Sequence, residues 1–359
     1  MGVGRFVYTP ILPLMIAQAH LSPKDAGLIA TANYVGYLLG AIAGIALPRL
    51  LQSTLTLRTS LAVLTATLAA MPLTDNVTDW LLLRLVAGVA SALIFMIAAS
   101  LMFTRLHEYG SHLIGWGFGG VGAGIAASGI LVLLLRDVSN WSAAWLASAA
   151  LAAIFSTLCW TLKTRPPVST TTMPSPPTRP GPPLLFVLVL ISYSLEGVGY
   201  IVAGTFLVAA IDQSAPGVIG AGAWTLVGLA ALPSTAFWAW LAYRFSRATL
   251  LVAALVAQAI GIALPALFAG AVPALMSAFL FGATFLGIAT LALALGSELQ
   301  FPRTIALLTT GYSVGQILGP LIVTPFVSHG YRVALLLGAA AVVAAAVAAG
   351  AVRMKAPAA

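Results

Sequence analysis

The chain has 359 residues, of which 61% are hydrophobic and only 7% are charged, and its mean hydropathy is +1.06. Soluble proteins carry about 25% charged residues, so the composition excludes a water-facing globular protein. Sixteen basic against eight acidic residues give a formal charge of +8. The basic residues stand singly between apolar runs, which excludes a nucleic-acid-binding face. The sequence therefore predicts an all-α polytopic membrane protein.

Apolar runs of roughly 20 residues, the length that crosses a bilayer, recur along the chain and predict eleven clear spans and a shorter first one. Before the second span, Ser22 and Pro23 predict a capped helix start, because serine accepts a free amide of the first turn and proline suits its first position. The twelve predicted spans cover residues 1–18, 24–47, 57–72, 79–103, 112–135, 141–162, 184–210, 217–242, 248–269, 272–297, 304–327 and 331–353.

The basic residues predict the side on which each loop lies, because lysine and arginine are retained in the cytoplasm. With a cytoplasmic N-terminus, eleven of the sixteen fall in inner loops or the C-terminal tail. Lys24, Arg136 and Arg332 fall in outer loops, and Arg5 and Arg84 lie within spans. We therefore expect a multi-pass protein of the inner (plasma) membrane with both termini in the cytoplasm.

The longest polar stretch, residues 163–183, contains eight prolines and several threonines. This composition is typical of a flexible linker. It divides the chain into an N-terminal bundle of six spans, residues 1–162, and a C-terminal bundle of six spans, residues 184–359.

Parts of the two halves match at a nearly constant offset: Gly2–Gly4 aligns with Gly197–Gly199, and Gly115 and Gly119 align with Gly311 and Gly315. The matches predict two bundles related by a pseudo-two-fold repeat. The same alignment predicts a first helix truncated at its N-terminus. The seventh span has about twelve mostly apolar residues before Glu196, whereas the first span has only Met1 before Gly2. Either translation begins upstream, or the first helix begins near the middle of the bilayer.

Several motifs resemble those of the major facilitator superfamily. Gly4–Met15 followed by Ala32–Gly40 resembles its YbfB/YjiJ-type branch. Arg84–Gly88 is similar to the superfamily's Arg-x-x-x-Gly motif, Gly115–Gly129 resembles the glycine-rich motif of antiporters, and Gly315–Pro320 carries that motif's Gly-Pro step. The resemblance implies twelve helices, transport by alternating access, and no enzymatic activity.

One loop departs from the superfamily's pattern. Where relatives carry Gly-x-x-x-Asp-Arg-x-Gly-Arg, residues Gly44–Gln52 keep only the first glycine and Arg49. Pro48 stands at the position of the aspartate and cannot form its ion pair. The sequence therefore lacks the aspartate of the charged latch that the resemblance implies.

Three charged residues lie inside the bilayer, away from the ends of their predicted spans, where an ionised group is costly and suggests a function. Glu196 lies midway along its span, and we interpret it as a proton-coupling group, with a structural ion pair as the alternative. Arg5 falls at a matching depth and could bind an anionic substrate bidentately or pair with Glu196. The resemblance assigns Arg84 to proton coupling, although its side chain could instead extend to the outer surface.

Polar and aromatic residues on the spans that the resemblance places around a central cavity form the rest of the predicted substrate site. A small-molecule site is mostly apolar with a few convergent polar groups, although helix packing remains the alternative role of each aromatic residue. Besides Arg5, these residues are Tyr8, Asn33, Tyr37, Trp116, Tyr193, Tyr200, Trp224, Thr225, Tyr312 and Gln316.

Two stripes of glycine at every fourth residue permit close helix approach. They comprise Gly36, Gly40 and Gly44 on the second span and Gly311, Gly315 and Gly319 on the eleventh. The resemblance places these two spans at the interface between the halves. Facing stripes there would let the halves rock during transport, and static packing is the alternative.

We conclude that the sequence predicts a proton-coupled secondary transporter of a small organic, anionic or zwitterionic solute, working as a monomer. The four histidines lie in or beside loops on opposite sides, so no metal site is predicted, and no cofactor or nucleotide-binding motif is present. A multidrug exporter by proton antiport and a non-transporting membrane sensor remain as alternatives. An enzyme acting on lipids would need acids or histidines clustered at one membrane surface, which the sequence lacks.

Overall fold

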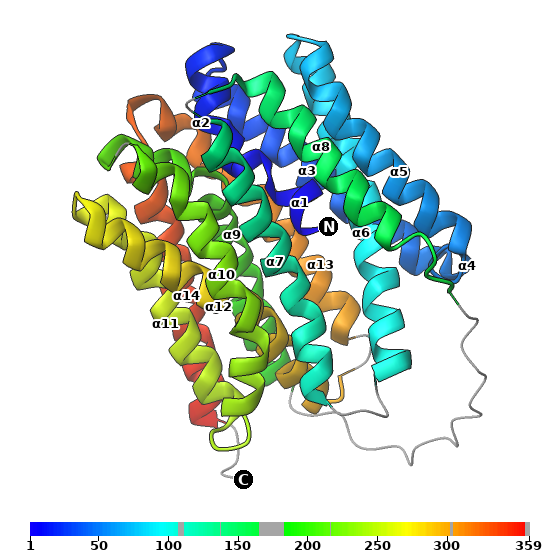
Figure 1. Ribbon diagram of the computed structural model, residues 1–359. Coiled ribbons are helices and arrows are strands. Elements are labelled where there is room, and N and C mark those ends of the chain that lie inside the picture. The colour runs from blue at the N-terminus through cyan, green and yellow to red at the C-terminus, as the bar shows by residue number, and fades with distance from the viewer. Residues whose placement is uncertain (107–110, 137, 165–182, 216, 302–303, 356–359) are drawn as a thin grey trace.

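The computed structural model describes residues 1–106, 111–136, 138–164, 183–215, 217–301 and 304–355, and every regular element in them is a helix (Figure 1). Eleven of these helices are long and apolar enough to cross a membrane. The protein is therefore a multi-pass helical membrane protein, as predicted. The predicted linker, residues 163–183, lies almost entirely outside the described residues.

The long helices follow the predicted spans closely, and short helices occupy three of the connections. The short elements are α4 (Pro48–Leu51), η1 (Met71–Leu73) and η3 (Thr324–His329). The long helices are α3 (Pro23–Ala46), α5 (Thr54–Ala70), α6 (Val77–Leu106), α7 (Ser111–Leu135), α8 (Trp141–Leu158), α9 (Pro183–Ser214), α10 (Val218–Leu241), α11 (Arg247–Leu267), α12 (Ala271–Glu298), α13 (Thr304–Val323) and α14 (Arg332–Lys355).

The first predicted span consists of two pieces, α1 (Gly2–Phe6) and α2 (Tyr8–Gln18), separated by Val7. Proline at position 10 explains the interruption, because it has no amide for the carbonyl of Phe6 and its ring crowds that carbonyl. The N-terminus lies partway along the bundle in Figure 1. The helix therefore lacks a backbone hydrogen bond at the carbonyl of Phe6, the residue next to Arg5.

Side-chain caps begin several helices where the sequence places serine or asparagine before an apolar run. The Ser22 hydroxyl accepts a hydrogen bond from the Asp25 amide at 3.1 Å, and Pro23 occupies the first helical position. This confirms the predicted start of the second span. Ser53, Asn140 and Ser246 cap α5, α8 and α11 in the same way.

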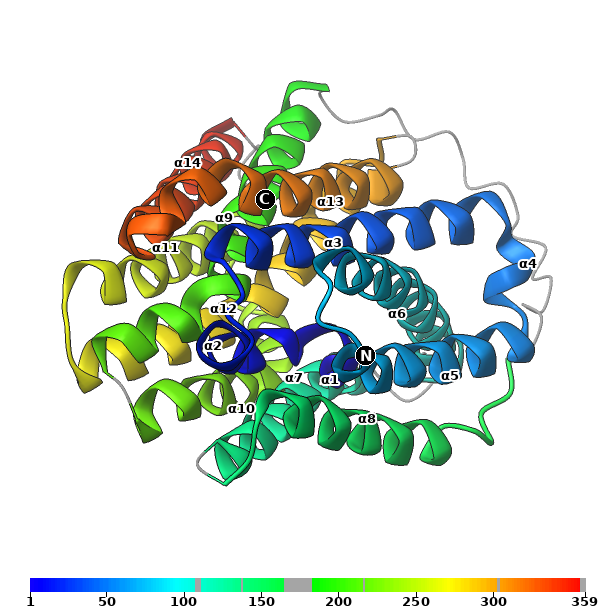
Figure 2. The ribbon, with the colours of Figure 1, turned by 90° about the horizontal axis from the view of Figure 1, so that it is seen from above.

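The predicted linker divides the helices by sequence into two groups, α1 to α8 and α9 to α14. The groups meet where α7 packs on α10, α3 on α13 and α2 on α9 (Figure 2). We call the end of the bundle at which α8 ends and α9 begins the linker end, and the opposite end the far end. The site described below lies between the groups.

The glycine stripes of α3 and α13 do not face each other, contrary to expectation. A Cβ atom at Gly36 or Gly40 would collide with the backbone of α6, and one at Gly315 or Gly319 would collide with the backbone of α9. Each stripe therefore packs within its own helix group. The sequence period defines one smooth face of a helix but does not say which neighbour covers it.

Close backbone approach between the groups occurs instead where α7 meets α10. A Cβ at Gly119 would overlap the carbonyl oxygen of Leu232, and one at Gly122 would lie 2.5 Å from the Leu232 amide nitrogen. At Gly228 of α10, a Cβ would lie 2.6 Å from the Ala126 Cα. This glycine-rich contact is the smooth interface between the groups.

We expect Gly119→Ala to lower the free energy of unfolding by about 1–3 kcal/mol, because the added methyl group must displace a helix backbone. Gly120 provides a matched control, since a Cβ there meets nothing within 4 Å. We expect Gly120→Ala to change stability by less than about 0.5 kcal/mol. Thermal unfolding of both variants in detergent measures the difference, and equal midpoints would contradict the close contact of α7 with α10.

Candidate functional site

The side chain of Arg5 connects the two helix groups at the centre of the site. It is 6% exposed, and its Nη2 donates a hydrogen bond to Oε1 of Gln316 on α13 at 2.8 Å. The guanidinium carbon lies 3.8 Å from the ring centroid of Tyr37, with Tyr34 and Phe6 farther away, at 5.7 and 5.3 Å. Aromatic faces and a neutral amide therefore surround a buried positive charge.

Within the described part of the chain, no carboxylate forms an ion pair with Arg5, and its Nε has no hydrogen-bond partner. The predicted alternative of a pair with Glu196 is wrong, because Arg5 bonds to Gln316 and Glu196 bonds to Gln258. A buried arginine stays charged. Its surroundings therefore fit an anion that supplies the missing negative charge.

A second buried arginine, Arg84 of α6, holds the backbone that carries Arg5. Its Nη1 donates to the Gly4 carbonyl at 3.2 Å and its Nη2 to the Arg5 carbonyl at 2.9 Å. The side chain is 2% exposed, so the alternative in which it extends to the outer surface is wrong. Asn33 donates in turn to the Arg84 carbonyl at 2.9 Å. Arg84 thus fixes α1 beside its interruption.

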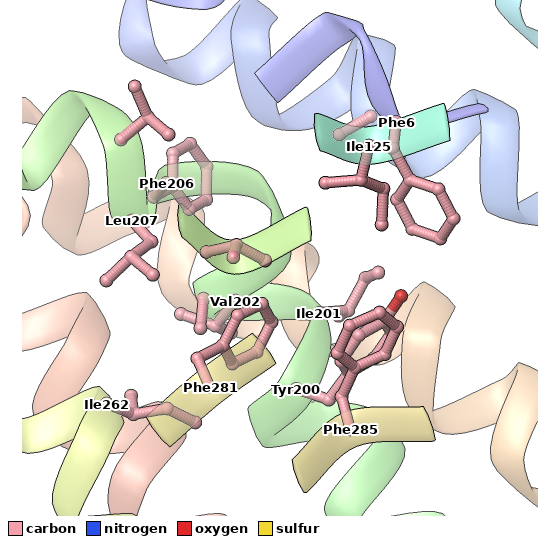
Figure 3. Close-up of a cluster of buried hydrophobic side chains, with 14 of the residues drawn as sticks. Phe6, Ile125, Tyr200, Ile201, Val202, Phe206, Leu207, Ile262, Phe281 and Phe285 are labelled. Carbon is pink, nitrogen blue, oxygen red and sulfur yellow. The ribbon is translucent and has the colours of Figure 1, made fainter. Parts of the chain in front are cut away.

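Stacked aromatic rings line the second helix group next to Arg5. Tyr193 stacks on Tyr312 with centroids 4.3 Å apart, and Tyr200 lies 6.0 Å from Tyr312. Tyr200 also stacks on Phe281 and Phe285 of α12, at 5.8 and 5.5 Å (Figure 3). Because Tyr312 lies one helical turn before Gln316, the stack extends to the partner of Arg5.

Glu196 lies on α9 between Tyr193 and Tyr200 and is completely buried. Its Oε1 accepts a hydrogen bond from Nε2 of Gln258 on α11 at 3.1 Å, and its Oε2 has no partner. The site therefore contains a buried carboxyl group that is not bonded to the arginine.

The far end of the interface between the groups is closed above the arginine. The Thr9 hydroxyl donates to the Gly204 carbonyl at 2.5 Å, and the Tyr34 and Thr205 hydroxyls are hydrogen-bonded at 3.3 Å. All residues of α9 from Gly199 to Ile211 are buried. The two helix groups therefore contact each other directly at the far end.

The structure brings together only some of the predicted substrate residues. Arg5, Tyr37 and Gln316 meet, and Tyr193, Tyr200 and Tyr312 form the adjoining stack. Among the others, Trp116 is 50% exposed, and Trp224 is buried with no partner for its indole nitrogen. Tyr8 donates to the Ala26 carbonyl at 3.0 Å, and Thr225 lies against Gly129 of α7.

Two residues of the site were missed by the sequence analysis. Tyr34 faces Arg5 and was not distinguished from the many other aromatic residues of the spans. Gln258 is a single amide in an apolar helix, and the cost of burying an unpaired amide applies to it as it does to Gln316. That argument could have identified Gln258. In the described residues, no three His, Cys, Asp or Glu side chains gather as metal ligands.

Comparison with known families identifies a relationship over nearly the whole chain. Residues 1–350 match the family described as "uncharacterised MFS-type transporter YbfB", where MFS denotes the major facilitator superfamily. The chain belongs to this transporter family. It is therefore a membrane transporter rather than an enzyme, as the motifs predicted. No curated protein sequence matches the chain.

Solved transporter structures share its fold. The nucleoside transporter NupG, in a mutant form, superposes with a TM-score of 0.72 at 16% identity, with 98% of this chain and 97% of that chain covered. A second NupG structure gives a TM-score of 0.68 at 16% identity, with 99% and 98% covered. At this level of identity the likeness concerns the fold alone.

Proposed function

We propose that the protein is a proton-coupled secondary transporter of a small organic solute that carries a carboxylate, alone or with an amino group. The observation that supports this most strongly is the buried Arg5 guanidinium, which is bonded to a neutral amide and lies between the two helix groups. An anionic solute would supply the opposite charge and could form two parallel hydrogen bonds with it.

The proposal includes alternating access by two six-helix bundles, residues 1–162 and 184–359, with the linker end and both termini in the cytoplasm. A repeated contact supports duplication: Gly88 packs on the Asn33 backbone and Gly282 on that of Val227. Gly282 follows Gly88 in the sequence by the same number of positions as Val227 follows Asn33. The broken α1 and α2 take the place of the first of twelve spans, and the protein works as a monomer in the inner membrane.

Within this cycle, the closed far end corresponds to an occluded outer side. Opening it requires the Thr9 and Tyr34 bonds across the groups to break, while α7 slides on α10. Arg84 stays bonded to the backbone of Gly4 and Arg5 while the helices move. A role for Arg84 in proton transfer stays a prediction. Glu196 provides the proton site.

Nucleosides are the second class of solute to consider, because NupG is a nucleoside transporter with this fold. They are neutral and would leave the Arg5 guanidinium without a counter-charge. We therefore propose carboxylates, before nucleosides, as the transported solutes.

Binding tests the proposal. We expect carboxylates or amino acids to raise the melting temperature of the purified protein, and Arg5→Gln to weaken their binding at least about 30-fold, or about 2 kcal/mol. Arg49→Gln removes the same charge from an exposed position on α4 and should leave binding unchanged. Equal carboxylate affinity in both variants would contradict the assignment, and stabilisation by cationic drugs alone would favour a multidrug exporter.

A further inference from the structure

Glu196 and Gln258 form an isolated polar pair inside the second helix group. Both side chains are completely buried, and they come from α9 and α11. Neither residue takes part in the contacts of Arg5 described above. The hydrogen bond of the pair is therefore separate from those of the arginine.

No cation neutralises the Glu196 carboxyl among the residues that the structure describes. The helices packed on α9 are α2, α10, α11, α12, α13 and α14. Between their ends, the titratable residues of α9 and these helices other than Glu196 are tyrosines, and Tyr193, Tyr200 and Tyr312 interact electrostatically with the carboxyl. The charged residues stand at helix ends: Asp212, Arg247, Glu298, Arg332, Arg353 and Lys355.

Two oxygen atoms of the pair lack a hydrogen-bond partner. They are Oε2 of Glu196 and Oε1 of Gln258. Both are acceptors when the carboxyl is ionised, so neither can satisfy the other, and a buried unsatisfied acceptor costs about 1–3 kcal/mol. A single hydrogen atom on Oε2 satisfies both, because the hydroxyl of a protonated carboxyl can donate to the amide oxygen.

We propose that Gln258 is the positioning residue of the proton site, and that it holds Glu196 in its protonated form through a two-bond pair of carboxylic acid and primary amide. One bond is present, from Nε2 of Gln258 to Oε1 of Glu196. The second runs from the Glu196 hydroxyl to Oε1 of Gln258. This inference deepens the proposed function and rests on it only for the use of the proton in transport.

A chain of neighbouring side chains connects the proton site to the solute site. Glu196 lies one turn from Tyr200, which stacks toward Tyr312, and Tyr312 lies one turn from Gln316. Release of the proton would leave a carboxylate and an amide oxygen facing each other. The two oxygens would repel each other and move apart. This movement would shift α9 against α11 and disturb the tyrosine stack beside Arg5.

Infrared difference spectroscopy tests the pair without any solute. We expect the wild-type protein at neutral pH to show the C=O stretching band of a protonated carboxyl, and Glu196→Gln to lose it. In Gln258→Leu the band should shift to higher frequency, because the carboxyl loses its hydrogen bonds. Gln52→Leu, at an exposed position, should leave the band unmoved, and thermal unfolding shows whether each variant is folded.

Two results would overturn the inference. One is absence of the band in the wild-type protein at neutral pH, which would mean an ionised Glu196. The other is an unmoved band in folded Gln258→Leu, which would leave Gln258 with no part in the pair. Failure of the proposed function would look different, because the band would respond as predicted while no solute moved protons through the wild-type protein.

Discussion

Gln316→Glu is expected to abolish binding of anionic solutes, with a loss of at least about 100-fold. Gln316 Oε1 lies 2.8 Å from Arg5 Nη2. The substitution places a carboxylate at this position, so the new side chain neutralises Arg5 in place of the solute. Close buried charge pairs contribute about 1.5–7 kcal/mol of coupling. The new ion pair should also hold α1 to α13, raise the melting temperature and stop transport.

Gln316→Leu is the control for this experiment, because it removes the same bond without adding a charge. It frees the Arg5 guanidinium, and we expect it to retain anion binding. Binding is measured by the thermal stabilisation that each solute produces, and transport by uptake into proteoliposomes. Anion affinity that is equal in Gln316→Glu and the wild-type protein would show that Arg5 does not contact the solute.

Glu196→Gln is expected to uncouple transport while leaving solute exchange intact. Glutamine has the shape of the protonated carboxyl and cannot lose the proton. Accumulation driven by a pH gradient should therefore disappear, whereas exchange of labelled for unlabelled solute should remain within about twofold of wild type, since binding at Arg5 is unaffected.

The matched control for this variant is Glu298→Gln, which changes an exposed carboxyl at the linker end that pairs with Arg247. We expect it to retain accumulation. Uptake into proteoliposomes with and without an imposed pH gradient measures both processes. Undiminished gradient-driven accumulation in Glu196→Gln would assign the proton to another group.

Much of the fold follows from local properties of the sequence. Apolar length defines the spans, and residues such as Ser22 and Pro23 define where a helix begins, so the predicted and observed ends differ by only a few residues. The packing partner of a helix face depends on the whole bundle. The stripe that begins at Gly36 therefore predicts a close helix contact, but its partner is α6 and not α13.

The site was predictable in part, because burying a charge or an amide in a membrane costs free energy, so such residues tend to have a function. That argument selected Arg5, Glu196 and Gln316, each of which has a specific buried partner. It did not reveal that Arg5 and Glu196 would be separate, since pairing depends on side-chain direction. Aromatic residues carried less information, and Trp116 proved to be half exposed.

We expect movement of a carboxylate-bearing solute through this protein to be linked to movement of a proton. The most direct measurement is the internal pH of proteoliposomes loaded with a pH-sensitive dye, after addition of carboxylates, amino acids, nucleosides or cationic drugs. We predict a pH change with a carboxylate or amino acid, which is lost in Glu196→Gln. A pH change of equal size in that variant would show that Glu196 does not carry the proton, and one produced by cationic drugs alone would show that carboxylates are not the solutes.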